Sequence, residues 1–223
     1  GLFCAAHAGP GVLVVDHARA PGEKIRISGG GRCNFTNLHC APEAFLGANP
    51  HFCKSALARY TQWDFIDLVG RHGIAWHEKT LGQLFCDDSA RQIIDMLLAE
   101  MRAAGAQLWL QTKVGEIGHD GSGFAVTLER EGRVVTVQAR NLVLATGGKS
   151  IPKMGATGLA YDIARQFGLA VQETRPGLVP FTFSDQRFAA ISGVSTPVRA
   201  KAARGPGFDE ALRAGSRPEL AFV

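Results

Sequence analysis

The sequence predicts an α/β fold, in which helices alternate with strands of a parallel sheet and a small antiparallel meander is inserted. Two helix-to-strand units support the parallel part: residues 1–8 lead into residues 12–15, and residues 89–104 lead into residues 106–111. Three short β-type runs within residues 113–139 predict the meander, because they are joined by turn residues. Alternation of this kind is typical of α/β domains.

The first unit begins in mid-element. Residues 1–8 read as a helix already under way, and the chain starts without a methionine, which suggests a fragment. A Gly-Pro-Gly break follows, and then residues 12–15 form an apolar run typical of a parallel strand buried under helices. Asp16 comes directly after this strand, where a dinucleotide-binding unit holds a ribose hydroxyl. Asp is also common at strand ends, so both interpretations of Asp16 stay open.

Residues 24–37 (KIRISGGGRCNFTN) form the most unusual stretch of the chain. Three glycines follow a strand-like run at residues 24–28, and glycine lets backbone N–H groups come close to a ligand. Lys24, Arg26 and Arg32 place positive charge on both sides of the bend. This combination suits an anionic, flat or phosphorylated ligand, whereas the alternative is an ordinary surface turn.

Two helices are predicted after this loop, at residues 51–60 and 61–71. The second helix carries Trp63, Ile66 and Val69 on one side.

The clearest predicted helix covers residues 89–104, with Asp88 as its N-cap and Gly105 at its C-terminal end. Short strands at residues 74–78 and 83–86 precede it. Its apolar side chains repeat with helical spacing and form a core-facing stripe. They are Ile93, Met96, Leu97 and Met101.

The later part of the first domain returns to strand and helix patterns. Residues 141–145 predict another buried strand, which leads into Thr146, Gly147 and Gly148. Residues 159–167 predict a helix with Thr157 as a candidate N-cap. Facing a phosphate is the alternative role for this helix start.

Gly168 is expected to end that helix, and the Pro-Gly-rich stretch at residues 176–180 predicts a domain boundary. Residues 181–183 and 194–198 beyond it look β-like. We therefore predict one domain at residues 1–176 and the beginning of a second, β-rich domain at residues 177–223.

Composition is that of a globular protein, with 223 residues, 46% hydrophobic residues and a net charge of +4. Five cysteines without a Cys-x-x-Cys pair disfavour a secreted disulfide framework. Neither a signal peptide nor an apolar run of membrane-spanning length is found, so the default prediction is a soluble cytoplasmic protein.

Three stretches together resemble one family, the BaiN/RdsA-like (YhiN-like) flavoproteins, often labelled NAD(P)/FAD-dependent oxidoreductase or aminoacetone oxidase family. They are residues 24–37, residues 144–158 (LATGGKSIPKMGATG) and residues 77–90 (HEKTLGQLFCDDSA). The resemblance covers residues 1–200.

The resemblance implies a Rossmann-like FAD-binding domain of the glutathione-reductase type, with a parallel sheet, a three-stranded meander and the start of a mainly β insert domain. Gly1 would be the last glycine of a Gly-x-Gly-x-x-Gly fingerprint, and Asp16 would bind the ribose. The family pattern also implies a set of further cofactor-binding residues. They are Lys24, Ser28, Gly29, Gly30, Gly31, Arg32, Cys33, Asn34, Thr146, Gly147 and Gly148.

Other interpretations of these motifs are weaker. Cys33 lacks a partner at redox-motif spacing and is expected to be a close-packing residue. Arg32 is a candidate for binding a substrate carboxylate or a reduced flavin, or else an ion-pair partner. The sequence around Lys149 fails the nucleotide P-loop pattern because Val143 stands where a glycine is required. Zinc ligation by four His and Cys side chains is disfavoured by their spacing. These are His39, Cys40, His51 and Cys53.

We therefore predict an FAD-dependent oxidoreductase that moves hydride or electrons between a small organic substrate and the flavin, with NAD(P)H as a candidate donor. No catalytic residue is assigned, and no metal, nucleic-acid or membrane partner is expected. One alternative is a non-catalytic dinucleotide-binding or regulatory flavoprotein module. Another is an RNA-associated protein, suggested by the basic pI and the Arg-Gly content, although the sequence lacks the interleaving of aromatic and basic residues that stacking on single-stranded RNA needs.

Overall fold

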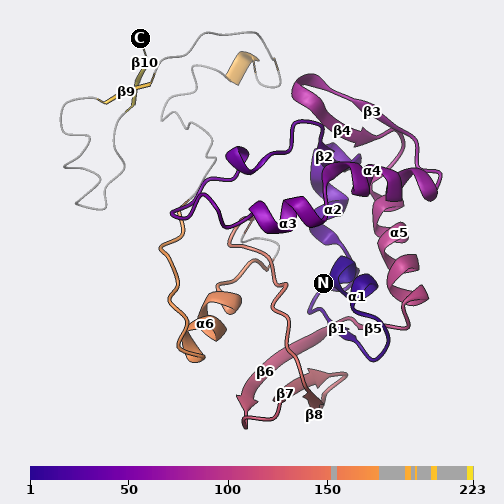
Figure 1. Cartoon of the computed structure of the whole chain (residues 1–223), viewed down its shortest axis with the longest axis vertical. Helices are drawn as coiled ribbons and strands as arrows, with labels where there is room; N and C mark the ends of the chain where they lie inside the picture. Colours follow the sequence, from indigo (N-terminus) through magenta and orange to yellow (C-terminus); the bar gives the residue numbers. More distant parts are fainter. Residues whose placement is uncertain (152–154, 176–188, 192–193, 195–201, 205–219, 223) are drawn as a thin grey trace. The chain divides into compact units, whose positions relative to one another are not determined.

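The computed structural model describes residues 1–151, 155–175, 189–191, 194, 202–204 and 220–222. The chain divides into two compact units, Gly1–Gln172 and Glu173–Val223, and the first contains all the elements that position the site (Figure 1). No helix within the described ranges is long and apolar enough to cross a membrane.

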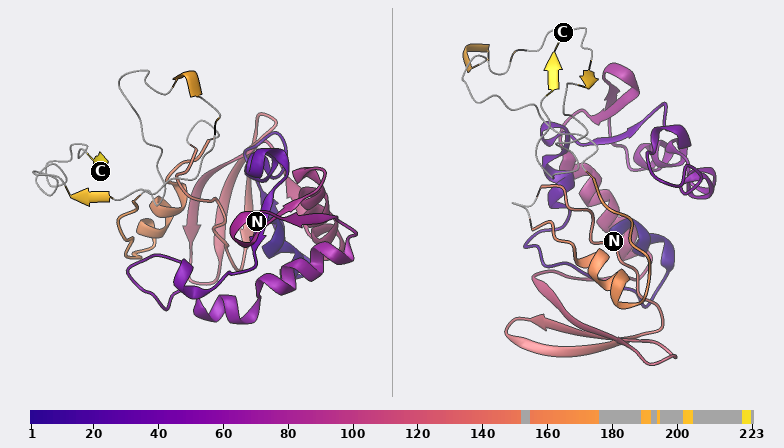
Figure 2. Two further views of the ribbon diagram at one scale, coloured as in Figure 1. Left: turned by 90° about the horizontal axis from the view of Figure 1, so that it is seen from above. Right: turned by 90° about the vertical axis from the view of Figure 1, so that its left-hand side faces the viewer.

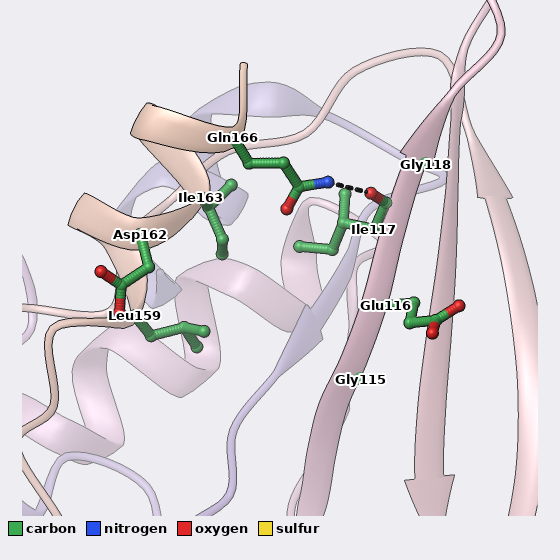
Figure 3. Close-up of a pocket in the computed structure, with 8 residues that line it drawn as sticks. All are labelled: Gly115, Glu116, Ile117, Gly118, Leu159, Asp162, Ile163 and Gln166. Atoms are coloured by element: carbon green, nitrogen blue, oxygen red, sulfur yellow. Dashed lines mark hydrogen bonds between the residues drawn. The ribbon is translucent and has the colours of Figure 1, made fainter. Parts of the chain in front are cut away.

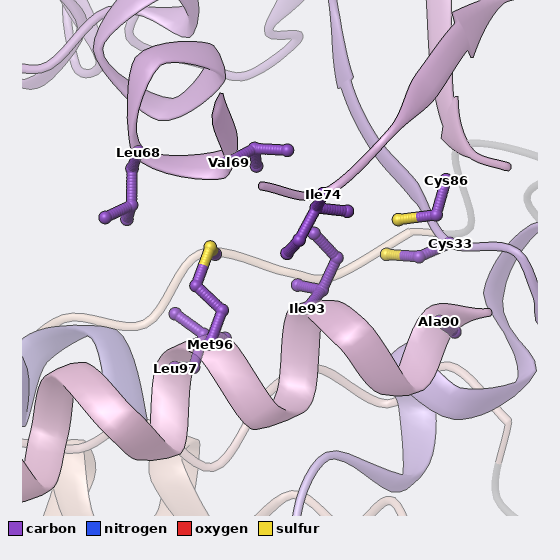
Figure 4. Close-up of a cluster of buried hydrophobic side chains, with 9 residues drawn as sticks. All are labelled: Cys33, Leu68, Val69, Ile74, Cys86, Ala90, Ile93, Met96 and Leu97. Atoms are coloured by element: carbon purple, nitrogen blue, oxygen red, sulfur yellow. The ribbon is translucent and has the colours of Figure 1, made fainter. Parts of the chain in front are cut away.

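Helix α5 (Ala90–Ala103) organises the core of the first unit, because it buries side chains on two sides. One side packs Ile93 and Met96 against Leu68 and Val69 (Figure 4). The other side packs Ile94 and Met101 against helix α1 (Leu2–Ala8), whose Ala5 is buried. Each large apolar side chain buried in this way contributes about 1.5–3 kcal/mol.

The N-cap of α5 is Ser89 and not the predicted Asp88. The Ser89 hydroxyl accepts the backbone N–H of Arg91 at 3.2 Å, and the Gln92 side chain accepts the N–H of Ser89 at 3.5 Å. This reciprocal pair is a capping box, which satisfies donors at both positions and so outcompetes the aspartate one residue earlier. The predicted helix end is confirmed, since Gly105 has φ 78° just after the helix.

The parallel pairing predicted for the two helix-to-strand units is confirmed. Strand β1 (Leu13–Val15) runs parallel to β5 (Gln107–Trp109), with Leu13 opposite Gln107. The prediction of a buried strand is only partly right, because all three residues of β1 pack against buried clusters but are themselves half-buried. In the described part of the chain this sheet has two strands, so β1 lacks the cover of a wider sheet.

The strand-like run at residues 24–28 is also corrected. It forms the short helix α2 (Glu23–Ile27), which starts after Gly22 in the left-handed conformation. Ile25 packs into both core clusters on α5, and this tertiary contact decides the conformation. Alternating Lys-Ile-Arg-Ile over so few residues does not distinguish a strand from a helix by period.

A second sheet follows the glycine loop, with strand order β2-β4-β3 and antiparallel pairing. Its strands are β2 (Asn34–Asn37), β3 (Trp76–Glu78) and β4 (Gln83–Cys86). Both predicted strands therefore exist, although the first begins at Trp76. Within the first unit this sheet lies at one end of α5 and the meander at the other (Figures 1 and 2).

Both predicted helices between β2 and β3 are present, as α3 (Lys54–Arg59) and α4 (Gln62–Arg71). Thr61 caps α4 through a reciprocal pair of hydrogen bonds with Asp64. The expected apolar side is only partly right, because the Trp63 side chain points to solvent while Val69 is fully buried. Phe65 and Leu68 share the buried face instead.

The predicted three-stranded meander is confirmed as β6 (Thr112–His119), β7 (Phe124–Arg130) and β8 (Arg133–Ala139). Helix α6 (Leu159–Gln166) packs on it through Ile163, and Gly168 with φ 73° ends the helix as predicted. The N-cap position is Gly158, although the predicted Thr157 does accept the Leu159 N–H at 3.3 Å.

Residues 141–145 were predicted as a buried strand, and this was wrong. They have no regular secondary structure, and Val143 and Leu144 are exposed. An apolar run becomes a strand only beside a hydrogen-bonding partner, and none of the described strands pairs with it.

In the second unit, β9 (Ala202–Arg204) pairs antiparallel with β10 (Leu220–Phe222), and a 3₁₀ turn covers Ala189–Ile191. The predicted boundary at residues 176–180 and the β-like run at 181–183 lie outside the described residues. Of the run at 194–198 only Val194 is described, without regular structure.

Candidate dinucleotide-binding site

The glycine loop has a backbone conformation that only glycine adopts without cost. It forms the 3₁₀ turn Ser28–Gly31, in which Gly29 has φ 59° and Gly30 has φ 68°. A Cβ on Gly29 would stand 2.5 Å from a ring carbon of Phe85, so this position is sterically closed. A Cβ on Gly30 would meet nothing within 4 Å, so the space beside Gly30 is open to a ligand.

Lys24 connects this region to the segment 146–150, far along the chain. Its Nζ donates to the carbonyl oxygen of Gly148 at 3.4 Å and to the Ser150 hydroxyl at 3.5 Å. A Cβ on Gly147 would stand 3.7 Å from the same Nζ. The fold therefore brings together Lys24, Gly147 and Gly148, which the sequence motifs placed in one site.

The Arg26 guanidinium is partly buried and donates to the Pro21 carbonyl oxygen at 3.3 Å. Lys24 and Arg32, whose side chain is exposed, also place positive charge beside the glycine loop. Among the described residues no carboxylate lies within ion-pair distance of Arg32, which leaves its guanidinium available to a ligand.

The end of β1 forms a second part of the candidate site. The Asp16 carboxylate accepts the Ala18 N–H at 3.0 Å and lies 3.7 Å from His17 Nδ1. Its side chain is 39% exposed, so one oxygen is accessible to a ligand. A Cβ on Gly155 would stand 2.7 Å from His17 Nε2, which shows that the loop before α6 packs directly against the end of β1.

The remaining predicted site residues differ in what their side chains can reach. Gly1 starts the chain beside Val14, and Thr146 is exposed in the irregular segment before Gly147. Ser28 opens the glycine turn, and Asn34 begins β2 opposite Phe85.

Cys33 turns its side chain into the core, and this limits its role. It is 5% exposed, and its sulfur lies beside that of Cys86 in the cluster around α5 (Figure 4). Burial raises the pKa of the Cys33 thiol, and burial raises the pKa of Cys86 to about 11. Thiols protonated in this way are poor nucleophiles. Cys33 could therefore meet a ligand only through its backbone, and the expected close-packing role agrees with its position.

Two structural features near the candidate site were not predicted from the sequence. Cys86 lies beside Cys33 only because β2 and β4 pair, which no spacing rule reveals. Leu81 has φ 62° and is 82% exposed in the turn between β3 and β4, and the sequence carries no Asn, Asp or Gly at that position to indicate a left-handed residue. Within the described ranges no group of three or more His, Cys, Asp or Glu side chains is arranged to hold a metal.

A cavity of about 430 Å³ lies elsewhere, between β6 and α6 (Figure 3). Leu159 and Ile163 form its apolar side, and Gln166 Nε2 donates to the Ile117 carbonyl oxygen at 2.6 Å. It contains none of the predicted site residues and no cluster of cations, so it is a packing gap beside the meander rather than a part of the candidate site.

The parallel strand pair, the acidic residue at its end, the open glycine turn and the inserted meander together define a Rossmann-type FAD-binding domain. The chain belongs to the HI0933-like Rossmann-domain family, whose family model matches residues 1–200.

Curated relatives share most of this chain. A ribosomal RNA dihydrouridine synthase of Escherichia coli strain K12 is 53% identical over 95% of the chain, and one of Haemophilus influenzae is 47% identical over 93%. A 3-dehydro-bile acid delta(4,6)-reductase of Clostridium scindens is 24% identical over 87%. These matches cover 54%, 53% and 46% of the relatives, so the chain spans about half the length of the enzymes it resembles.

Solved structures give a weaker likeness. The halogenase PltM, in complex with phloroglucinol and FAD, matches 77% of this chain and 34% of its own with 18% identity and a TM-score of 0.36. No functional argument follows from a likeness at this level.

These findings refine the expected family and correct one expectation. The flavoprotein oxidoreductase family is confirmed. Within it, sequence identity is high to a ribosomal RNA dihydrouridine synthase and low to the bile acid reductase. The prediction that no nucleic acid is involved was wrong, because both close relatives are named for ribosomal RNA. The net charge of the chain did not reveal this connection to RNA, because a mild charge of +4 does not distinguish an RNA substrate from a small anion.

Proposed function

We propose that this chain is the FAD-binding part of an enzyme that reduces uridine in ribosomal RNA to dihydrouridine. The observation that carries the proposal is the 53% and 47% identity to two ribosomal RNA dihydrouridine synthases over nearly the whole chain. The distant bile acid relative supports the same reaction type, because its name also denotes saturation of carbon–carbon double bonds.

The chemistry is a two-electron reduction. Dihydrouridine forms when the C5–C6 double bond of the uracil ring, conjugated to the C4 carbonyl, gains a hydride and a proton. FAD, when bound and reduced, supplies the hydride, and we propose NAD(P)H as the donor that reduces it. The nicotinamide loses one hydride for each double bond saturated, so electrons balance.

A fit to FAD is supported by two observations taken together: the left-handed glycine turn with open space beside Gly30, and the Lys24 ammonium held next to Gly147 and Gly148. Backbone N–H groups of such a turn suit the phosphates or the edge of the flavin ring. The Lys24 ammonium, beside Gly147 and Gly148, would hold a phosphate or the flavin carbonyl edge. Asp16 would accept hydrogen bonds from the ribose hydroxyls of the adenosine half.

The exposed Arg32 would stabilise negative charge on the reduced flavin or bind an RNA phosphate. Such an enzyme would work where ribosomal RNA is found, and we propose a cytoplasmic location on that ground.

The test uses the full-length protein that contains this chain, purified with its flavin. Ribosomal RNA that lacks dihydrouridine is incubated with it and either NADH or NADPH, and digested RNA is analysed by mass spectrometry for uridines that have gained two hydrogen atoms. We expect dihydrouridine to form in step with nicotinamide oxidation.

A protein that reduces steroid enones or oxidises small amines while leaving the RNA unchanged would contradict the proposal. The expectation of a small organic substrate would then be the better one. A flavin that no nicotinamide and no substrate reduces would favour the non-catalytic alternative.

A further inference from the structure

The turn between β3 and β4 combines two unfavourable features in one residue. Leu81 lies in the left-handed backbone region, with φ 62° and ψ 32°, and its side chain is 82% exposed. A left-handed conformation is strained for a residue with a Cβ, and exposing leucine forgoes the stabilisation that burial would give. Glycine, asparagine or aspartate would form such a turn with less strain.

The surrounding contacts hold this turn in one geometry. The Asn37 side chain donates to the Leu81 carbonyl oxygen at 2.9 Å, and the Leu38 N–H donates to the Gly82 carbonyl oxygen at 2.8 Å. A Cβ on the buried Gly82 would stand 2.7 Å from the His39 ring. The backbone is fixed from several sides, while the Leu81 side chain is left free of packing.

The turn also has a defined position relative to the glycine loop. β2 connects the two, since it begins at Asn34 beside the loop and ends at Asn37, whose side chain holds Leu81. Three steps along a strand span about 10 Å.

A uridine in folded ribosomal RNA is stacked between neighbouring bases, and a ring that must lie against a flavin has to leave that stack. Apolar side chains such as leucine open base steps when they enter between them. We propose that Leu81 is such a wedge: it enters the stack next to the target uridine and keeps that base available to the flavin side of the glycine loop. The inference rests on the function proposed above and adds a substrate-positioning residue to it.

The decisive variant is Leu81→Asn in the full-length, flavin-loaded protein. Asparagine has nearly the same size as leucine and tolerates the left-handed conformation, so the turn is kept while the apolar wedge is lost. Leu169→Asn is the matched control, because Leu169 is 64% exposed just after α6. Leu81→Met, which keeps an apolar side chain, is the conservative variant.

Two readouts separate a wedge from a structural role. For folded ribosomal RNA we expect kcat/KM to fall about tenfold or more in Leu81→Asn, because the polar side chain no longer holds the base step open. For a short unstructured uridine-containing RNA we expect the wild-type rate. Leu81→Met and Leu169→Asn should stay near wild type on both.

The second readout needs no turnover. A fluorescent 2-aminopurine placed beside the target uridine of a folded RNA hairpin brightens when it unstacks. Wild-type protein should raise its fluorescence, and Leu81→Asn should bind the RNA without doing so.

Equal fluorescence gains for wild type and Leu81→Asn, or an equal loss of rate on folded and unstructured RNA, would overturn the wedge. A wild-type enzyme that reduces neither RNA would overturn the proposed function itself, a result distinct from a silent Leu81 variant.

Discussion

At Gly29 the backbone is left-handed and the place of a Cβ is taken by the Phe85 ring, 2.5 Å away. Gly30 has almost the same backbone conformation but open space beside it. The two neighbouring glycines therefore differ: Gly29 permits packing onto β4, whereas Gly30 faces open space, where we propose that the ligand approaches.

We expect Gly29→Ala to destabilise the protein by about 3 kcal/mol, from backbone strain plus overpacking, and Gly30→Ala by about 1 kcal/mol, from strain alone. Urea unfolding of the full-length protein without flavin measures both. The opposite order should hold for FAD binding, where Gly30→Ala blocks the ligand. Equal losses of stability would contradict the packing assigned to Gly29.

Lys24 is predicted to bind the cofactor through its charge. Lys24→Gln should raise the Kd for FAD about tenfold, because hydrogen bonds to charged groups contribute about 1.5–3 kcal/mol. Lys54→Gln, at an exposed position of α3, serves as the control. Titration of the apoprotein with FAD, followed by flavin fluorescence, checks this. An unchanged Kd for Lys24→Gln would remove Lys24 from the site.

At the scale of elements, the start of α5 shows how a cap selects its residue. We expect Ser89→Ala to cost about 1 kcal/mol of unfolding free energy, because Ser89 holds the capping box, and Asp88→Ala to cost less than about 0.5 kcal/mol. Chemical unfolding of the two variants in parallel measures the difference. A larger loss for Asp88→Ala would restore the aspartate as the functional cap.

The turn between β6 and β7 depends on a carboxylate. Asp120 Oδ1 accepts the N–H groups of Ser122 and Gly123 at 2.8 and 3.0 Å. Hydrogen bonds from the Ser122 hydroxyl and from these N–H groups lower the pKa of Asp120 from 3.8 to about 2. The folded protein thus favours the charged form, and this contribution to stability is complete above the unfolded pKa and is lost as pH falls toward 2.

We therefore expect wild type to have a higher Tm than Asp120→Ala above pH 4, and the difference to shrink as pH approaches 2. Thermal unfolding at a series of pH values tests this. A difference that stays constant down to pH 2 would show that the carboxylate charge is irrelevant to the turn.

Across the whole molecule, the secondary structure was predicted correctly where the local preference of a segment matches the conformation that its tertiary contacts favour. Turn residues predicted the meander, and a 14-residue amphipathic helix with glycine after its end predicted α5. The prediction failed where tertiary contacts decide: α2 is a helix because Ile25 packs on α5, and residues 141–145 lack a described partner strand.

The candidate site likewise contains features that local motifs predicted and features that depend on contacts between distant segments. The motifs assigned Lys24 and Gly148 to one cofactor site, and in the fold the Lys24 ammonium donates to the Gly148 carbonyl oxygen, while their role toward a cofactor stays a prediction. The inward turn of Cys33 toward Cys86 and the strained exposure of Leu81 arise from strand pairing between distant segments, which no local pattern encodes. The proposed RNA substrate was not predicted as the leading partner, because the recognisable motifs of this chain are those expected for a cofactor and fold alone does not reveal a substrate.

We propose above that this chain is the FAD-binding part of a ribosomal RNA dihydrouridine synthase. The most direct measurement is the dihydrouridine content of ribosomal RNA from cells in which the gene for the full-length protein has been deleted, determined by mass spectrometry before and after the gene is restored. We predict that dihydrouridine disappears from the ribosomal RNA on deletion and returns with the wild-type gene. Unchanged dihydrouridine in the deleted cells would contradict the claim.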